Sequence, residues 1–341
     1  MNPANRPARM TSLLISAAFV LVACSGPGPS GSTSPSKAPG PPLKIAQTVW
    51  VGYGPLYLAK AKGFFAQEGV DVELVQQQDF RQQFVALAAN QVDGIANVVD
   101  AAISYRVPGV DYKIVLAMDD SLGGDGIAST NDIKTIADLK GKKVAYETGA
   151  TAQFFLNVQL HKAGMTEKDI THVDMLGSDA GAALLAGKVD AAVTYEPYLS
   201  QLRSSGTTHV LLDTTTAPGL IIDILLFSKQ VIDQRPNDIK AVVRAYYKAL
   251  DYMKQNPDDA VKIMAAGVGG FLENPKDFAD TMKYVVFYDK ERNAKYFDSA
   301  NDPSVFTTLK NAIEIWGSIN PNLGVIPDPK DLVDASFISG G

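Results

Sequence analysis

Cysteine and histidine are scarce in this sequence. Its 341 residues include one cysteine, Cys24, and three histidines, His161, His172 and His209. A single cysteine excludes a disulfide within the chain and a metal site built from several thiolates. None of the histidines falls in a loop expected to carry a site, and no metal-ligand spacing joins them to acidic residues. We therefore predict no metal, no cofactor and no catalytic residue.

Long apolar runs and positive charge are lacking as well. No internal run approaches the roughly 20 apolar residues that cross a membrane. The net charge of −6 at pH 7 argues against a nucleic-acid partner, because neutralising phosphates requires a basic face. Apolar residues make up 46% of the chain and charged residues 20%, which is ordinary for a folded protein, and the length allows two lobes with their own cores.

The first residues have the pattern of an export signal. Arg6 and Arg9 precede an apolar stretch, Leu13–Val22, that is about ten residues long and too short to span a membrane. The small residues that follow it and Cys24 resemble the lipobox of bacterial lipoproteins, in which the cysteine is lipidated and becomes the first residue. An ordinary signal peptide with an incidental cysteine is the alternative. We predict a signal peptide over residues 1–23 and a lipid anchor at Cys24 on the outer face of the bacterial cytoplasmic membrane.

Residues 24–42 have the composition of a linker. Six prolines, five serines and four glycines occupy the eighteen positions from 25 to 42. Such a stretch has no apolar periodicity and forms no core, and at roughly 3 Å per residue it reaches about 50 Å when extended. We predict a tether between the lipid anchor and the folded part of the chain.

A short pattern occurs twice along the chain. Ala86–Asp100 reads ALAANQVDGIANVVD and Ala183–Pro197 reads ALLAGKVDAAVTYEP, with 97 positions between equivalent residues. Each copy predicts a helix that ends at a residue tolerant of left-handed geometry, Asn90 or Gly187, and then a Val-Asp pair, an apolar strand and a polar loop. Chance similarity between two helix–strand units is the alternative.

The flanking segments also recur in order. A strand, Leu43–Ala46 or Lys142–Ala145, leads through a loop into a helix, and a second strand follows at Val70–Val75 or Ile170–Met175. This alternation predicts parallel strands joined by right-handed crossovers. Two such lobes present loops at the carboxyl ends of their strands, where a ligand is expected between them. Later helices are expected to begin at prolines: Pro236, Pro257 and Pro275.

Three separated blocks resemble one family. The chain is similar to the substrate-binding proteins of nitrate/sulfonate/taurine-type ABC importers, a group that includes thiamine-precursor binders, over Gly52–Leu74, Glu147–Gly164 and Asp179–Ser200. In these blocks it reads GYGPLYLAKAKGFFAQEGVDVEL, ETGATAQFFLNVQLHKAG and DAGAALLAGKVDAAVTYEPYLS.

The resemblance implies an α/β fold of the two-lobe, type II periplasmic-binding-protein kind. Each lobe is expected to be a mostly parallel sheet flanked by helices, with two crossovers between the lobes. Lobe 1 is expected over residues 43–127 and 229–341, and lobe 2 over residues 128–228. The chain should pass between lobes near Ile127–Thr130 and return near Leu226–Lys229.

We predict a ligand site at the strand exits of the two repeats and near the crossings. The resemblance places Thr151 at a helix N-terminus, where backbone N–H groups suit a polar ligand atom. The predicted ligand-binding residues are Trp50, Tyr53, Asp79, Phe80, Asn97, Asp120, Ser121, Glu147, Thr151, Asp179, Tyr195, Glu196 and Asp223. Alternatives remain for some of them: Asp79 caps the following helix, Trp50 and Tyr53 serve lobe packing, and Asp119 and Asp120 belong to a solvated turn.

Acidic residues outnumber basic ones around these positions. Arg81 and Arg106 are the basic residues nearby, whereas a nitrate or sulfonate site normally supplies arginine, lysine or converging N–H donors. Carboxylates beside aromatic rings suit an ammonium, amidine or guanidinium group. We therefore predict a small nitrogenous ligand, neutral or cationic, of the urea, guanidine or amine type. Taurine, other sulfonates and nitrate are the alternatives.

The resemblance also implies how such a protein works. The ligand bridges the two lobes, hinge closure follows, and the permease and ATPase subunits of an ABC importer receive the closed form. We expect a monomer that binds a small molecule and no nucleic acid and that is held at the membrane by its lipid. A pyrimidine-precursor-type enzyme and a sensor subunit on the same fold are the competing interpretations.

Overall fold

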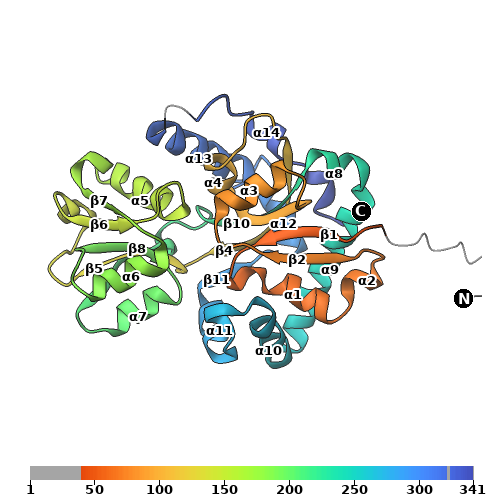
Figure 1. The fold of residues 1–341 in the computed structure, drawn as a ribbon, viewed down its shortest axis with the longest axis horizontal. Coiled ribbons are helices and arrows are strands. Elements are labelled where there is room, and N and C mark those ends of the chain that lie inside the picture. Colours follow the sequence, from red (N-terminus) through yellow and green to blue (C-terminus); the bar gives the residue numbers. More distant parts are fainter. Residues whose placement is uncertain (1–39, 321–322, 341) are drawn as a thin grey trace, which may run out of the picture. The chain divides into compact units, whose positions relative to one another are not determined.

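The computed structural model describes residues 40–320 and 323–340. The predicted signal peptide, the lipidation of Cys24 and the tether up to residue 39 lie outside the described residues. Within the described ranges, none of the helices has the length and apolar character that a membrane crossing requires. The folded part contains two β-sheets with helices packed on both faces of each (Figure 1).

The first sheet has six strands in the spatial order β2-β1-β3-β10-β4-β11. Their bounds are β1 (Leu43–Gln47), β2 (Val72–Gln76), β3 (Gly94–Val98), β4 (Tyr112–Ser121), β10 (Ile222–Ser228) and β11 (Val285–Phe287). The helices on one face are α1 (Gly54–Ala61), α2 (Phe64–Gln67), α9 (Pro236–Gln255) and α10 (Pro257–Val268). Those on the other face are α3 (Phe80–Ala88), α4 (Val99–Ser104) and α13 (Val305–Ile319).

Shorter helices complete the cover of this sheet. They are α8 (Lys229–Gln234), α11 (Pro275–Thr281), α12 (Lys290–Tyr296) and α14 (Pro329–Leu332). The predicted helix starts at Pro236, Pro257 and Pro275 are confirmed, because α9, α10 and α11 begin at these residues. Proline suits a first turn since its φ is already near the helical value and its missing N–H has no partner to lose there.

The second sheet has five strands in the order β7-β6-β8-β5-β9. Their bounds are β5 (Asp125–Thr130), β6 (Lys143–Tyr146), β7 (Thr171–Asp174), β8 (Ala191–Tyr195) and β9 (Thr208–Asp213). Strand alternation sends Val144 and Tyr146 toward α5 (Thr151–Lys162) on one face. Ala145 faces α6 (Gly177–Leu185) and α7 (Tyr198–Ser204) on the other (Figure 1).

The two sheets share one strand arrangement. β10 lies between β3 and β4 and is antiparallel to both, and β5 lies in the same way between β8 and β9. Each of these two strands follows directly after the chain has crossed from the other sheet. Each crossing enters its sheet at the edge where the neighbouring strands end. The strand that follows the crossing, β5 or β10, therefore begins at that edge and runs antiparallel to its neighbours. The sheets are therefore mixed, and the strands other than β5, β10 and β11 run in one direction within each sheet, as expected.

The crossings lie earlier in the chain than predicted. Residues 122–124 join β4 to β5 and residues 214–221 join β9 to β10, rather than segments near Ile127–Thr130 and Leu226–Lys229. The strands β5 and β10 that follow the crossings are as apolar as the other strands of both sheets. Their composition therefore does not show where the chain passes from one lobe to the other. The two crossings touch, because the N–H of Gly123 donates to Thr214 Oγ1 at 2.7 Å.

The internal repeat is confirmed by matching hydrogen bonds. Asp93 Oδ2 accepts from the N–H of Lys44 at 2.7 Å, and Asp190 Oδ2 accepts from the N–H of Lys143 at 2.7 Å. At both preceding helix ends the stop residue has a positive φ, 54° in the first copy and 66° in the second. The Val-Asp pair thus ties the first strand of each lobe to the strand that follows the repeated helix.

We expect Asp93→Ala and Asp190→Ala to lower the free energy of unfolding by similar amounts, about 1 kcal/mol each, since each removes one hydrogen bond of the same kind. The two carboxylates lie in different sheets, so the losses should add in the double variant. Urea unfolding measures all three variants, with the exposed Asp71→Ala as a control that changes stability by less than about 0.5 kcal/mol. A loss in one variant and none in the other contradicts the equivalence.

Candidate functional site

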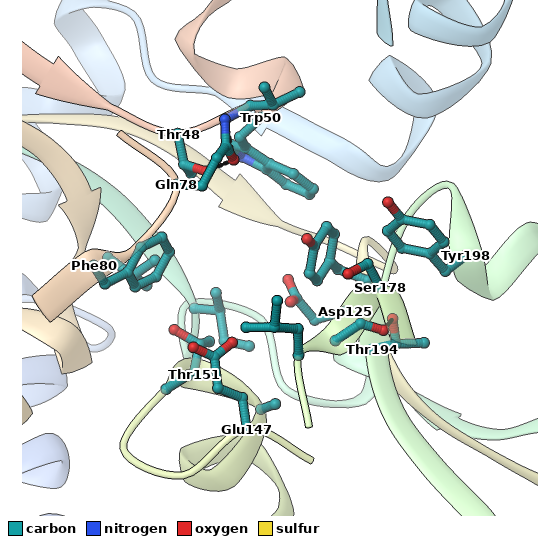
Figure 2. A pocket seen from close by; sticks show the side chains of 18 of the residues that line it. Thr48, Trp50, Gln78, Phe80, Asp125, Glu147, Thr151, Ser178, Thr194 and Tyr198 are labelled. Atoms are coloured by element: carbon teal, nitrogen blue, oxygen red, sulfur yellow. Dashed lines mark hydrogen bonds between the residues drawn. The ribbon is translucent and has the colours of Figure 1, made fainter. Parts of the chain in front are cut away.

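A cavity of about 430 Å³ lies where strands of both sheets end (Figure 2). From the first sheet it is lined by residues that follow β1 and β2, among them Trp50 and Phe80. From the second sheet it is lined by residues at or after the ends of β6, β7 and β8, among them Glu147, Ser178 and Tyr195. The carboxyl ends of parallel strands are the usual place for a ligand in α/β folds.

Aromatic side chains form much of the cavity wall. Trp50, from the first sheet, and Tyr195, from the second, have ring centroids 6.4 Å apart in an edge-to-face arrangement. Tyr195 lies 5.5 Å from Tyr198, and Tyr198 lies 5.5 Å from Phe271, measured between ring centroids. This row of rings crosses from β8 and α7 to the turn before α11. Ring faces of this kind favour flat and cationic groups.

Three carboxylates also line the cavity: Asp125, Glu147 and Asp223. Among the lining residues, all of them in the described part of the chain, there is no lysine, arginine or histidine. The Tyr53 hydroxyl donates a hydrogen bond to Asp223 Oδ1. Figure 2 shows Asp125 and Glu147 pointing into the same space as Trp50. The cavity is therefore acidic as well as aromatic.

Burial disfavours the charged forms of these acids. It raises the pKa of Asp125 to about 6. Burial also raises the pKa of Glu147, with a further contribution from the charge of Asp79. The pKa of Asp223 is raised by burial first and by the charge of Asp119 second. A positively charged ligand would act against these shifts, because an opposite charge favours the ionised carboxylate.

A hydrogen bond at the cavity wall joins α4 to α5. Thr151, the first residue of α5, donates from its hydroxyl to Asp100 Oδ1 at 3.1 Å. Asp100 is 1% exposed, and its Oδ2 has no hydrogen-bond partner among the described residues. Burial raises the pKa of Asp100 to about 7. Thr151 therefore holds the two lobes together in addition to lining the cavity.

Many of the predicted residues come together in the cavity wall. They are Trp50, Tyr53, Phe80, Glu147, Thr151, Tyr195 and Asp223. Their contact with a ligand stays a prediction. The alternative in which Trp50 and Tyr53 serve lobe packing also has support, because both side chains are buried and each donates a hydrogen bond to an aspartate of the first sheet.

Other predicted residues lie outside the cavity lining, two of them with side chains held by local partners and one exposed. Asp79 caps α3, with its Oδ1 accepting from the N–H of Gln82 at 3.2 Å. Asn97 donates from its side-chain amide to Gln83 Oε1 at 2.8 Å. Asp179 is an exposed residue in the first turn of α6.

The end of β4 holds two more of these residues. Asp120 Oδ2 accepts from the N–H of Gly219 at 3.0 Å, and the side chain is 8% exposed, so it does not belong to a solvated turn. The Ser121 hydroxyl donates to Asp125 Oδ2 at 2.6 Å. Ser121 therefore reaches the cavity only through Asp125.

Glu196 turns away from the cavity. It is 1% exposed and accepts hydrogen bonds from Arg203 Nη1 at 3.2 Å and from the N–H of Ser200 at 3.1 Å. Arg203 also donates to the Tyr284 hydroxyl at 3.1 Å. Glu196 and Tyr284 border a second cavity of about 460 Å³ between α7 and α11. Because Glu196 already has a cationic partner, it is not available to a ligand in the first cavity.

Several lining residues were not predicted, among them Asp125, Tyr198 and Phe271. Two of them carried a signal in the sequence that could have identified them. Tyr198 stands in the same Tyr-Glu-Pro-Tyr stretch as Tyr195, and Asp125 follows the polar end of β4. Phe271 had none, because it belongs to a turn between α10 and α11 that only the tertiary fold brings to the cavity.

Known proteins of similar sequence and structure include binding proteins. The riboflavin-binding protein RibY of Chloroflexus aurantiacus is 28% identical over 357 residues, which cover 98% of this chain and 98% of that protein. A putative aliphatic sulfonates-binding protein of Bacillus subtilis is 27% identical over 261 residues, 74% of this chain and 76% of that protein. The periplasmic aliphatic sulphonate binding protein SsuA of Escherichia coli superposes with a TM-score of 0.70 at 20% identity, covering 87% of this chain and 92% of that chain.

The structural likeness to SsuA confirms the predicted two-lobe periplasmic-binding-protein fold. The family model described as NMT1/THI5 like matches residues 50–260, which is more than half of the chain. The resemblance to nitrate/sulfonate/taurine-type substrate-binding proteins that the sequence suggested is thereby confirmed, and the chain belongs to the NMT1/THI5 like family.

Proposed function

We propose that this chain is an extracytoplasmic solute-binding protein that delivers a small nitrogenous compound, of the urea, guanidine or amine type, to an ABC importer. The observation that carries the proposal is the charge of the cavity wall, where Asp125, Glu147 and Asp223 meet no lining lysine, arginine or histidine in the described chain. Carboxylates accept charge-assisted hydrogen bonds from N–H groups, each worth roughly 1.5–3 kcal/mol. Two or three such bonds allow micromolar affinity.

The aromatic residues support the same ligand class. Trp50 and Tyr195 come from different lobes, so a flat nitrogen compound in the cavity that contacts both rings touches both lobes at once. A guanidinium or amidine plane can stack on such rings while its N–H groups point at the carboxylates. The cavity volume of about 430 Å³ lies within the range of small-molecule sites.

A sulfonate is the second candidate, and helix geometry favours it. Thr151 at the start of α5 and Gly177 at the start of α6 both line the cavity, and helix N-termini suit anions. The names of the Bacillus subtilis relative and of SsuA point the same way. Taurine combines an ammonium with a sulfonate and could use both kinds of partner, whereas a plain alkanesulfonate has to tolerate three nearby carboxylates.

We propose hinge closure without catalysis as the mechanism. The ligand bridges the lobes and shifts the population to the closed form, which the permease and ATPase subunits recognise. The proposed hinge consists of the two crossings between the lobes, which are joined by the hydrogen bond from Gly123 to Thr214. Anchoring through Cys24 and a monomeric state belong to the same proposal. Use of the closed form by a sensor partner is the alternative to import.

Isothermal titration calorimetry against a panel tests the ligand class. The panel holds guanidinium chloride, methylguanidine, urea and ethanolamine on one side and methanesulfonate, taurine and nitrate on the other, with riboflavin included because RibY is named for it. We expect micromolar binding of at least one guanidine- or amine-type compound. Tight binding of methanesulfonate with no response to the nitrogen compounds refutes the proposal, and riboflavin binding alone would redirect it to a larger neutral heterocycle.

A further inference from the structure

Two aspartates lie side by side behind the cavity wall. Asp119 of β4 and Asp223 of β10 are direct register partners on neighbouring antiparallel strands, so their side chains project from the same face of the sheet. Both are buried, with 0% and 3% of their surfaces exposed. Asp223 lines the cavity and Asp119 does not. Two like charges at such positions repel each other, and a buried pair of carboxylates cannot readily hold both.

One carboxyl oxygen of Asp119 is buried without a hydrogen-bond partner among the described residues. The indole N–H of Trp50 donates to Oδ1 at 3.2 Å, while Oδ2 has no hydrogen-bond partner among the described residues. The backbone of Gly52 is pressed against this carboxyl, because a Cβ built on Gly52 would lie 1.7 Å from Oδ2. An ionised Oδ2 would therefore be a buried charge without solvation, which is costly unless a proton or a cation neutralises the pair.

Among the described residues, the groups that act on the pair by contact or by charge supply no positive charge. They are an indole, two phenols and three further carboxyls: Trp50, Tyr53, Tyr246, Asp100, Asp120 and Asp125. The Tyr246 hydroxyl donates to the carbonyl of Met118 at 2.6 Å, which leaves Tyr53 as the phenol that donates to Asp223. Arg292 of α12 acts on Asp120, whose pKa it lowers against the larger effect of burial.

The pKa values of Asp119 and Asp223 are both raised. Burial raises the pKa of Asp119, and the charges of Asp120 and Asp125 raise it further, while hydrogen bonding from Trp50 and with Asp223 lowers it. Burial raises the pKa of Asp223, and the charge of Asp119 adds to this. A hydrogen bond between two carboxyls requires one of them to be protonated. The geometry and the direction of the shifts therefore agree on a protonated pair in the empty site.

We propose that Asp119 and Asp223 hold one proton between them in the free protein and that the positive charge of the ligand replaces this proton on binding. The O–H bond of the carboxyl pair breaks, the proton leaves to solvent, and the cation takes up its hydrogen bonds with the ionised Asp223. The charge of the buried site is unchanged by this exchange. Asp119 is a positioning residue, because it acts on the ligand through Asp223. The inference rests on the proposed cationic ligand for the direction of the proton movement.

The shared proton can be tested in the free protein, without any ligand. The chain has two tryptophans, and Trp50 touches the pair, so a Trp316→Phe variant makes Trp50 the only indole reporter. We expect its emission to titrate well above the usual range of an aspartate, because burial raises the pKa of Asp119 to about 8. The transition should disappear in the Trp316→Phe/Asp119→Asn variant. If Trp316→Phe does not fold, the difference between wild type and Trp50→Phe gives the same reading.

The exchange itself is tested with two probes of similar shape and different charge, guanidinium and urea. The dissociation constant of guanidinium should fall close to tenfold per pH unit while the pair is protonated and level off above that range, whereas that of urea should stay constant. Calorimetry in buffers of different ionisation enthalpy should count close to one proton released per guanidinium. Above about pH 7, where Asp125 with its pKa of about 6 is already ionised, both the slope and the proton release should be lost in Asp119→Asn, even if affinity changes little.

The outcomes separate the two proposals. A Trp50 emission that stays constant across the pH range, or a transition that survives Asp119→Asn, overturns the shared proton and leaves the ligand class standing. Guanidinium binding without proton release overturns the exchange. A Trp50 transition with no binding of either probe, or of any other nitrogen compound in the calorimetry panel, removes the proposed ligand class and the exchange together. Binding of methanesulfonate without proton release does the same, because an anion retains the proton that a cation expels.

Discussion

An Asp223→Asn variant is expected to bind guanidinium-type ligands about a hundredfold more weakly than the wild-type protein, a loss of about 3 kcal/mol. Asp223 is the lining carboxylate that a phenol orients, since the Tyr53 hydroxyl donates to its Oδ1. Asparagine keeps the shape and this acceptor but removes the charge. A cation in a buried site then loses a charge-assisted hydrogen bond and its counter-charge, which together cost several kcal/mol.

Asp120→Asn is the matched control for this variant. Asp120 is also a buried aspartate on a central strand of the first sheet, but its Oδ2 accepts from the N–H of Gly219 and the residue does not line the cavity. Titration calorimetry should place its affinity within about threefold of wild type, a change of about 0.6 kcal/mol. Equal losses in both variants would mean that general electrostatics, and not contact with Asp223, governs binding. An unchanged affinity in Asp223→Asn removes this carboxylate from the ligand site.

Asp119 and Asp120 illustrate what the sequence could and could not predict. An acidic pair at the end of β4, close to a crossing, could be read directly from the residues. Successive residues of a strand face opposite ways, so the choice between the two depends on the register between β4 and β10. The prediction named Asp120, whereas the structure pairs Asp119 with Asp223. Register is set by pairing between distant segments, which local composition does not encode.

The repeat was predictable for the opposite reason. Asp93 and Asp190 both belong to the same local unit of helix, stop and strand, and this unit can be identified without knowing their partners, the N–H groups of Lys44 and Lys143, which lie 49 and 47 residues earlier in the chain. Glu196 shows the limit of this local reasoning. Its place in the polar loop after β8 was read correctly from the repeat, but Arg203 of α7, seven residues further on, forms an ion pair with its side chain. The pattern of the repeat does not show which nearby helix supplies such a cation.

A Gly52→Ala variant is expected to lose about 3 kcal/mol of stability or more, although it adds only one methyl group. A Cβ at this position would lie 1.7 Å from Asp119 Oδ2 and 2.4 Å from its Cγ, far inside van der Waals contact. Neither side can move freely, because Gly52 is buried in the turn after β1 and Asp119 is held by Trp50 and its own strand. Overpacking of a tight core usually costs 1–3 kcal/mol, and here the contact is with a buried carboxyl. The midpoint of thermal unfolding should fall by roughly 6 °C or more.

Two further variants identify Asp119 as the cause of this loss. Gly317→Ala is the matched control, because Gly317 lies in α13 with nothing within 4 Å of an added Cβ, and alanine in a helix should raise stability by about 0.5–1 kcal/mol. In the double variant Gly52→Ala/Asp119→Ala the clash is gone, so the two substitutions should destabilise by clearly less than the sum of the single ones. Additive losses would place the strain elsewhere in the turn. A Gly52→Ala protein as stable as wild type would show that the backbone and the Asp119 carboxyl are not in contact. Oδ2 would then have room for a water molecule that solvates its charge. The shared proton would lose its support, because it depends on an Oδ2 that has no solvation.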